Sequence, residues 1–84
     1  MANLHDIIAL IETAEQRESN PADAHGRYET AERLIEETLV DMGFTREIII
    51  QYPNNFISQR FLPLYNRIIA GYARLTVIRG AIFL

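Results

Sequence analysis

The chain has 84 residues, of which 49% are hydrophobic and 23% charged, and its formal net charge is -3. A single domain of this length buries little more than half of the surface of its unfolded chain, so its own core leaves it marginally stable. It contains no cysteine. This excludes disulfides, cysteine nucleophiles and cysteine zinc sites, and it favours a reducing compartment such as the cytoplasm.

Charged side chains interrupt the apolar stretches at both ends of the chain. Acidic residues divide the apolar positions of residues 1–15, so no signal-peptide core forms there. Four arginines divide the apolar region 60–79 into pieces much shorter than the roughly 20 residues of a membrane-spanning helix. We therefore expect a soluble cytoplasmic protein that has no membrane segment.

The two halves of the chain carry opposite charge. Residues 1–43 hold ten acidic and three basic side chains, and residues 44–84 hold one glutamate and five arginines, so the halves carry about -7 and +4. Every basic residue is arginine, which makes forked hydrogen bonds to carboxylate or phosphate where lysine offers only a point charge. This choice indicates either a role in binding or a compositional bias of the source genome.

Two helices are predicted in the first half of the chain, over residues 4–18 and 21–42. Asn3 and Asn20 can cap their first turns, and Gly43 provides a left-handed residue after the second. Apolar residues recur at helical spacing in both. The expected core positions are Leu4, Ile7, Ile8, Ile11 and Ala14 in the first helix and Ala24, Tyr28, Ala31, Ile35, Leu39 and Met42 in the second.

A short third segment covers residues 45–51. Thr45 can cap it, and although the isoleucine run 48–50 also fits a strand, we predict a helix. The sequence Tyr-Pro-Asn-Asn at residues 52–55 then breaks the chain, because the residue before a proline avoids helical backbone angles and asparagine favours turns.

A long last helix is predicted over residues 56–78, with Pro63 kinking or splitting it. Arg79 would fall in the middle of its apolar stripe, so we expect the helix to end near Ile78 with Gly80 as its cap. Residues 80–84 would then form a detached apolar tail. The expected core positions of this helix are Ile57, Phe61, Leu64, Tyr65, Ile68, Tyr72 and Leu75.

These elements predict an all-α fold, a small bundle of three main helices and a short connecting helix. The sequence shows neither an internal repeat nor a boundary between domains. We therefore expect residues 1–84 to form one helical domain.

Arg60, Arg67 and Arg74 are spaced by seven residues and lie within roughly 40° of each other on the last predicted helix. A complementary stripe on the second helix consists of His25, Glu29, Glu32 and Glu36. If the two helices pack antiparallel, the glutamates of one stripe lie opposite the arginines of the other along the helix–helix contact. The arginines are then used in ion pairs within or between subunits.

The alternative is that the arginines bind an anionic small molecule or a nucleotide. Arginine can donate two parallel hydrogen bonds to a phosphate group, and tyrosine can stack on a nucleotide base. The residues of this candidate site for an anion or a partner are Arg60, Arg67, Arg74, Tyr65, Tyr72 and Asn66.

Other kinds of site find little support in the sequence. His25 and Glu29 lie one helical turn apart, but the other histidine, His5, is on another helix, so we expect no metal site. Ser19 and Ser58 have no histidine at a suggestive spacing, and we predict no catalytic residue, no cofactor and no enzymatic activity. An acidic chain with few arginines disfavours direct nucleic-acid binding.

The sequence contains more apolar residues than one small core can cover. The surplus consists of residues 48–50 and 81–84 with Phe56, Leu62, Ile69 and Val77. Contiguous exposed apolar patches usually mark interaction sites, so we expect a homo-oligomer, most simply a homodimer. The predicted interface residues are Ile69, Val77, Ile82, Phe83 and Leu84.

The function that follows is that of a small non-enzymatic protein-protein interaction module. It would act as a regulator, an inhibitor or an assembly subunit, and its size fits an accessory protein of a virus or mobile element. The alternative is an oligomeric binder of an anionic small molecule or nucleotide through the arginine and tyrosine residues of the last helix.

Overall fold

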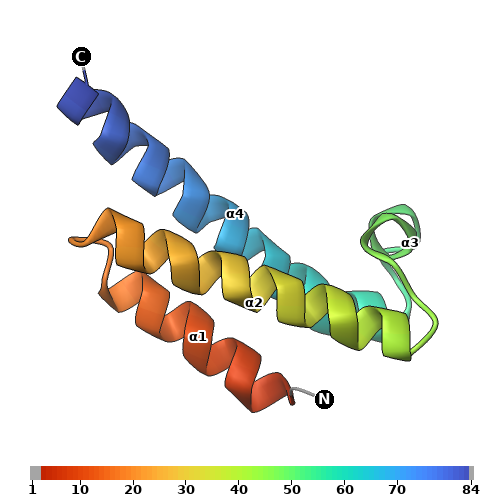
Figure 1. Ribbon diagram of the computed structural model, residues 1–84. Helices are drawn as coiled ribbons and strands as arrows, with labels where there is room; N and C mark the ends of the chain where they lie inside the picture. The colour runs from red at the N-terminus through yellow and green to blue at the C-terminus, as the bar shows by residue number, and fades with distance from the viewer. Residues whose placement is uncertain (1–2, 84) are drawn as a thin grey trace.

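Four helices make up the part of the chain that the computed structural model describes, which is the backbone of residues 3–83 and the side chains as far as Val77. They are α1 (Leu4–Gln16), α2 (Pro21–Asp41), α3 (Arg46–Gln51) and α4 (Phe56–Phe83), and the described residues form no strand (Figure 1). The predicted all-α bundle of three main helices and a short connecting helix is confirmed.

The first three helices begin where the capping residues predict. The side-chain oxygens of Asn3, Asn20 and Thr45 each accept a hydrogen bond from the backbone N–H three residues further along the chain. Gly43, which follows α2, has a φ of 81°, a value at which a residue without a Cβ costs least. The isoleucine run 48–50, whose sequence also fits a strand, lies in the helix α3, as predicted.

α4 runs antiparallel to α2 and parallel to α1. The ring of Tyr72 lies 5.2 Å from that of His25 near the start of α2, whereas Arg46, beyond the end of α2, lies over the ring of Tyr65. Figure 1 shows α4 running along the α1–α2 pair. The second and the last helix therefore pack antiparallel, which is the arrangement under which the acidic and the arginine stripes would face each other.

The core consists of the apolar stripes of the three long helices and one residue of α3. Of the expected positions, Met42 is wrong, because α2 ends at Asp41 and the Met42 side chain is 43% exposed. Ile49 of α3 and Ser58 of α4 are fully buried, and the Ser58 hydroxyl donates to the carbonyl of Tyr52 at 2.6 Å. The buried apolar residues are Ile7, Ile11, Ala14, Ala24, Tyr28, Ala31, Ile35, Leu39, Ile49, Phe61, Leu64, Tyr65, Ile68 and Leu75.

The end of α4 differs from the prediction. The helix is not split at Pro63, and its backbone continues through Gly80 to Phe83, so the expected end near Ile78 and the detached tail are wrong. The last turns of α4 pass beyond the α1–α2 end of the bundle (Figure 1), so the core stripe does not continue alongside them. A charged residue at position 79 therefore gives no reason for the helix to end. The kink at Pro63 stays a prediction.

Candidate interaction surface

Two of the three arginines of the predicted stripe form ion pairs with glutamates, one in the last turn of α1 and one in the turn that follows it. Arg67 donates from Nε and from Nη2 of its guanidinium group to the two oxygens of Glu15, at 3.1 and 2.6 Å. Arg74 makes the same kind of contact with Glu18, at 2.8 and 2.9 Å. The hydrogen bonds that Arg67 donates to Glu15 raise the pKa of Arg67 above its ordinary value, and those that Arg74 donates to Glu18 do the same for Arg74. Arg67 and Arg74 are therefore used in ion pairs within the chain.

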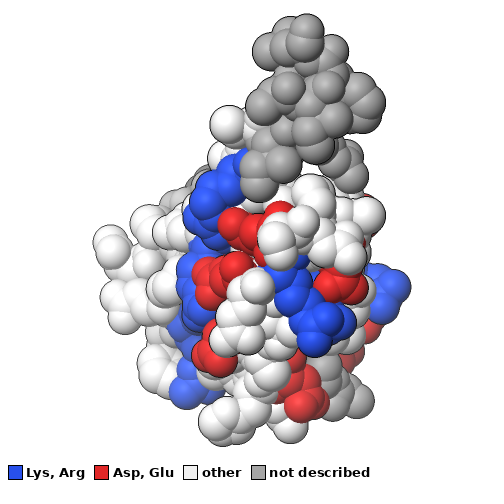
Figure 2. Space-filling model, turned by 90° about the vertical axis from the view of Figure 1, so that its left-hand side faces the viewer, with Lys and Arg blue, Asp and Glu red and all other residues white. Residues whose placement is uncertain are grey.

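The predicted partners of Arg67 and Arg74 on the second helix are wrong. α4 packs against both α1 and α2. Its Arg67 and Arg74 side chains point toward the end of α1 and not toward the acidic stripe of α2 that contains Glu32. The third arginine, Arg60, lies over the ring of Phe56 at 4.9 Å. On the face that Figure 2 shows, basic and acidic side chains lie next to each other instead of in separate patches.

The Arg74–Glu18 pair continues to a buried tyrosine of α2. The hydroxyl of Tyr28 donates to Glu18 at 2.6 Å. Burial, and then the Glu18 bond, raise the pKa of Tyr28 to about 12. The Arg74 hydrogen bond in turn lowers the pKa of Glu18 below its ordinary value of 4.5. These three side chains join the turn after α1 to α2 and α4 at one end of the bundle.

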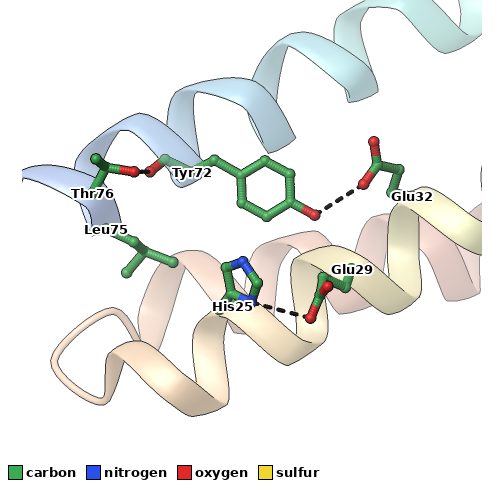
Figure 3. A pocket seen from close by; sticks show the side chains of 6 residues that line it. All are labelled: His25, Glu29, Glu32, Tyr72, Leu75 and Thr76. Carbon is green, nitrogen blue, oxygen red and sulfur yellow. Dashed lines mark hydrogen bonds and ion pairs between the residues drawn. The ribbon is translucent and has the colours of Figure 1, made fainter. Parts of the chain in front are cut away.

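A cleft of about 320 Å³ lies between α2 and α4 (Figure 3). The Tyr72 hydroxyl donates to Glu32 at 3.0 Å, and His25 Nδ1 lies 3.1 Å from a carboxylate oxygen of Glu29. Burial and the Glu32 bond raise the pKa of Tyr72 well above its ordinary value. Glu32 also pairs with Arg46 at 3.1 Å, so the polar groups of this cleft already satisfy one another.

The residues predicted to bind an anion do not come together. Tyr72 turns toward α2, whereas Arg67 and Arg74 turn toward α1. Among the residues whose side chains are described, no group of three or more His, Cys, Asp or Glu side chains is placed to hold a metal ion.

The apolar groove between α3 and α4 contains three of the predicted site residues, Tyr65, Asn66 and Ile69. It has a volume of about 370 Å³ and is lined by Arg46, Ile50, Leu62, Tyr65, Asn66 and Ile69, a set that we call the α3–α4 groove. Ile50 and Ile69 are 58% and 50% exposed. Both walls of the α3–α4 groove therefore carry apolar side chains, Ile50 on the α3 side and Leu62 and Ile69 on the α4 side.

Tyr65 forms a buried part of the groove wall. Its hydroxyl has no hydrogen-bond partner among the described residues, and the Arg46 guanidinium carbon lies 4.9 Å from its ring centroid. Burial, and then the nearby Glu36 carboxylate, raise the pKa of Tyr65 to about 12, so the group keeps its proton at neutral pH.

The exposed apolar surface continues from the groove along α4. Ala70 and Ala73 are exposed, and Val77 is 72% exposed. The predicted interface residues Ile69 and Val77 are thus on the surface. The side chains of Ile82, Phe83 and Leu84, which share that prediction, lie outside the described residues.

Sequence reasoning missed Arg46 as a residue of the groove. The Thr45 cap predicts where α3 begins, but it does not show that Arg46 reaches back to Glu32 and covers the ring of Tyr65. That placement depends on the turn through Gly43, which sets the direction of α3 against α4. No local pattern in the sequence encodes this direction.

Comparison with known proteins adds no relative to this description. The chain matches no protein-family model, and neither a curated protein nor a solved structure matches it. Within the described residues, α4 is the longest helix, and neither it nor any other helix is apolar over a length that would cross a bilayer.

Proposed function

We propose that this protein is a non-enzymatic interaction module that acts as a homo-oligomer in the cytoplasm. It binds its partners through the α3–α4 groove and through the exposed apolar residues of α4. We call these residues, Ile69, Ala70, Ala73 and Val77, the outward side of α4. The observation that carries the proposal is the exposure of Ile50, Ile69 and Val77 on neighbouring parts of one surface. Connected exposed apolar side chains are typical of surfaces that bind another protein.

The distribution of charge supports the same function. Arg67 already binds a carboxylate of α1, Arg74 binds one in the turn after α1, and Arg46 binds Glu32 of α2. An anionic ligand would have to displace these glutamates, so the arginines do not favour a nucleotide site. Ile50, Ile69 and Val77 are exposed and apolar, which favours association with a protein surface.

The oligomeric state in solution tests the proposal. We expect light scattering to give a mass that rises above the 9.7 kDa of one chain as the concentration increases. An Ile69→Asp variant should stay at 9.7 kDa because it places a carboxylate in the apolar surface. The matched control is Ala9→Asp, at an exposed position of α1, which should associate as the unmodified chain does.

A mass of 9.7 kDa at every concentration up to roughly 1 mM would refute the homo-oligomer. Equal loss of association in both variants would show that added negative charge, and not the outward side of α4, controls it. Urea unfolding of each variant shows whether it remains folded.

A further inference from the structure

The outward side of α4 carries a row of residues that is centred on Ala73. Ile69 precedes Ala73 by four residues and Val77 follows it by four, so the two branched side chains flank Ala73 at about 40° on either side of its direction. Asn66 and Leu62 extend the row toward the α3–α4 groove. Ala73, Ile69 and Val77 are all exposed. A row with this symmetry can meet a second copy of itself when the two helices run in opposite directions.

The chemistry of this row also suits self-association. None of its five residues, Leu62, Asn66, Ile69, Ala73 and Val77, is charged. Two copies of a chain with a net charge of -3 can therefore approach along this row without placing like charges opposite each other. The small side chain at its centre lets two helix backbones come close.

The groove and Val77 lie at opposite ends of the row. The groove is lined by Leu62 and Ile69 on α4, and Val77 lies two turns further along, 72% exposed. The last turns of α4 pass beyond the α1–α2 end of the bundle (Figure 1). Antiparallel pairing brings the Val77 region of one copy over the groove of the other, whereas parallel pairing would place groove against groove.

We propose that two copies of this chain pair through α4 in antiparallel orientation, with a two-fold axis at Ala73. Val77 of each copy enters the α3–α4 groove of the other beside Ile69 and Ile50. This inference rests on the proposed function, because it names the occupant of the interaction surface and its register.

The size of the row sets the strength of the dimer. Leu62 and Val77 are 15 residues apart, a length of about 22 Å along the helix. One helix face of this length buries less than the roughly 800 Å² per partner of a standard stable interface. The dimer is therefore weak and forms in the micromolar to millimolar range, which is the range to be measured.

Disulfide trapping reads the register directly. The chain has no cysteine, so a single introduced cysteine can bridge only two copies. The variants are Ala73→Cys, Ile69→Cys and Val77→Cys, with Ala9→Cys on α1 as the control. Under mild oxidation, Ala73→Cys should form covalent dimers with itself, since a disulfide needs Cα atoms about 4.4–6.8 Å apart. The control should remain monomeric.

The mixed reaction separates the two orientations. When Ile69→Cys is mixed with a size-tagged Val77→Cys, the hybrid dimer should form about ten times faster than either homodimer, because position 69 faces position 77 only in the antiparallel register. Homodimers of each variant that form faster than the hybrid would show parallel pairing and overturn the inference.

The outcomes also separate this inference from the proposed function. If light scattering shows a dimer but Ala73→Cys crosslinks no faster than the Ala9→Cys control, the register is wrong and the homo-oligomer stands. If the chain is monomeric throughout the concentration range, both fail. Because all four positions are exposed, the variants should keep the urea unfolding transition of the unmodified chain.

Discussion

The ring of Tyr28 fills the space beside the α-carbon of Gly71, where α2 and α4 cross. A Cβ added at position 71 would overlap two ring carbons and the hydroxyl of Tyr28. The ring cannot easily move aside, because it is fully buried and its hydroxyl is bonded to Glu18. Glycine at this position is therefore what allows α2 and α4 to approach each other.

We expect Gly71→Ala to destabilise the protein by about 2 kcal/mol, as overpacking of a core contact does. This loss occurs although alanine is the better helix former by about 1 kcal/mol. The matched control is Gly26→Ala in α2, where an added Cβ has nothing within 4 Å. That variant should gain up to about 1 kcal/mol, and urea unfolding measures both. Similar gains in the two variants would show that the Tyr28 ring yields.

The buried hydroxyl of Tyr65 provides a second prediction, because it has no hydrogen-bond partner among the described residues. Replacement by phenylalanine removes a desolvated polar group and no bond, so Tyr65→Phe should be as stable as the original chain or more stable by about 1 kcal/mol. Tyr28→Phe is the matched comparison. It loses a 2.6 Å bond to a carboxylate and should cost about 2 kcal/mol.

Thermal and urea unfolding of the two variants give opposite signs if this account is right. A destabilised Tyr65→Phe protein would show that its hydroxyl is satisfied in solution. The comparison controls for size, since each variant removes one oxygen from a buried tyrosine.

The starts of α1, α2 and α3 are predictable from nearby residues, whereas the end of α4 and the ion pairs between helices are not. Asn3, Asn20 and Thr45 each bond to the backbone three residues away, so the signal and its effect lie in the same short segment. Arg67 and Glu15 are 52 residues apart. Both α1 and α2 carry acidic side chains, and only the packing of α4 against the two helices shows that Arg67 pairs with Glu15 of α1.

The candidate interaction surface is likewise only partly predictable from the sequence. Helical periodicity separates Ile69 and Val77 from the core residue Ile68, and their exposure is confirmed. The other wall of the groove could not be predicted, because Ile50 belongs to a run of three isoleucines that fits more than one structure. Only the packing of α3 shows that Ile49 turns inward and Ile50 outward.

The ion pair between Arg67 and Glu15 should contribute modestly to stability. The two side chains are 37% and 32% exposed, so solvent screens their attraction. A double-mutant cycle with Arg67→Gln and Glu15→Gln should give a coupling of about 0.5–1 kcal/mol, near the upper end for exposed pairs because the contact is bidentate. A coupling above this range would show that the pair fixes the position of α4.

The control cycle uses Arg33 and Glu37 in α2, which are 3.9 Å apart and about two-thirds exposed. It should give no measurable coupling. Both cycles should weaken as salt is added, because the charges of each pair remain in contact with solvent.

The Glu18 carboxylate makes stability depend on acid pH. It accepts hydrogen bonds from Arg74 at 2.8 Å and from Tyr28 at 2.6 Å, and the Arg74 bond lowers its pKa below 4.5 in the folded protein. The unfolded chain then takes up a proton at higher pH than the folded chain does. The contribution of Glu18 is therefore complete above about pH 4.5 and declines as the pH falls through the lowered folded value.

The difference in unfolding free energy between the original chain and Glu18→Gln isolates this contribution. It should be constant from neutral pH down to about pH 5 and then shrink in more acidic buffer, as measured by urea unfolding at each pH. Glu37→Gln is the matched control because the Glu37 side chain is 64% exposed and 3.9 Å from its nearest arginine, so its effect should be small at every pH. A Glu18→Gln difference that does not shrink in acid would show that lost packing, rather than the lost carboxylate, explains the destabilisation.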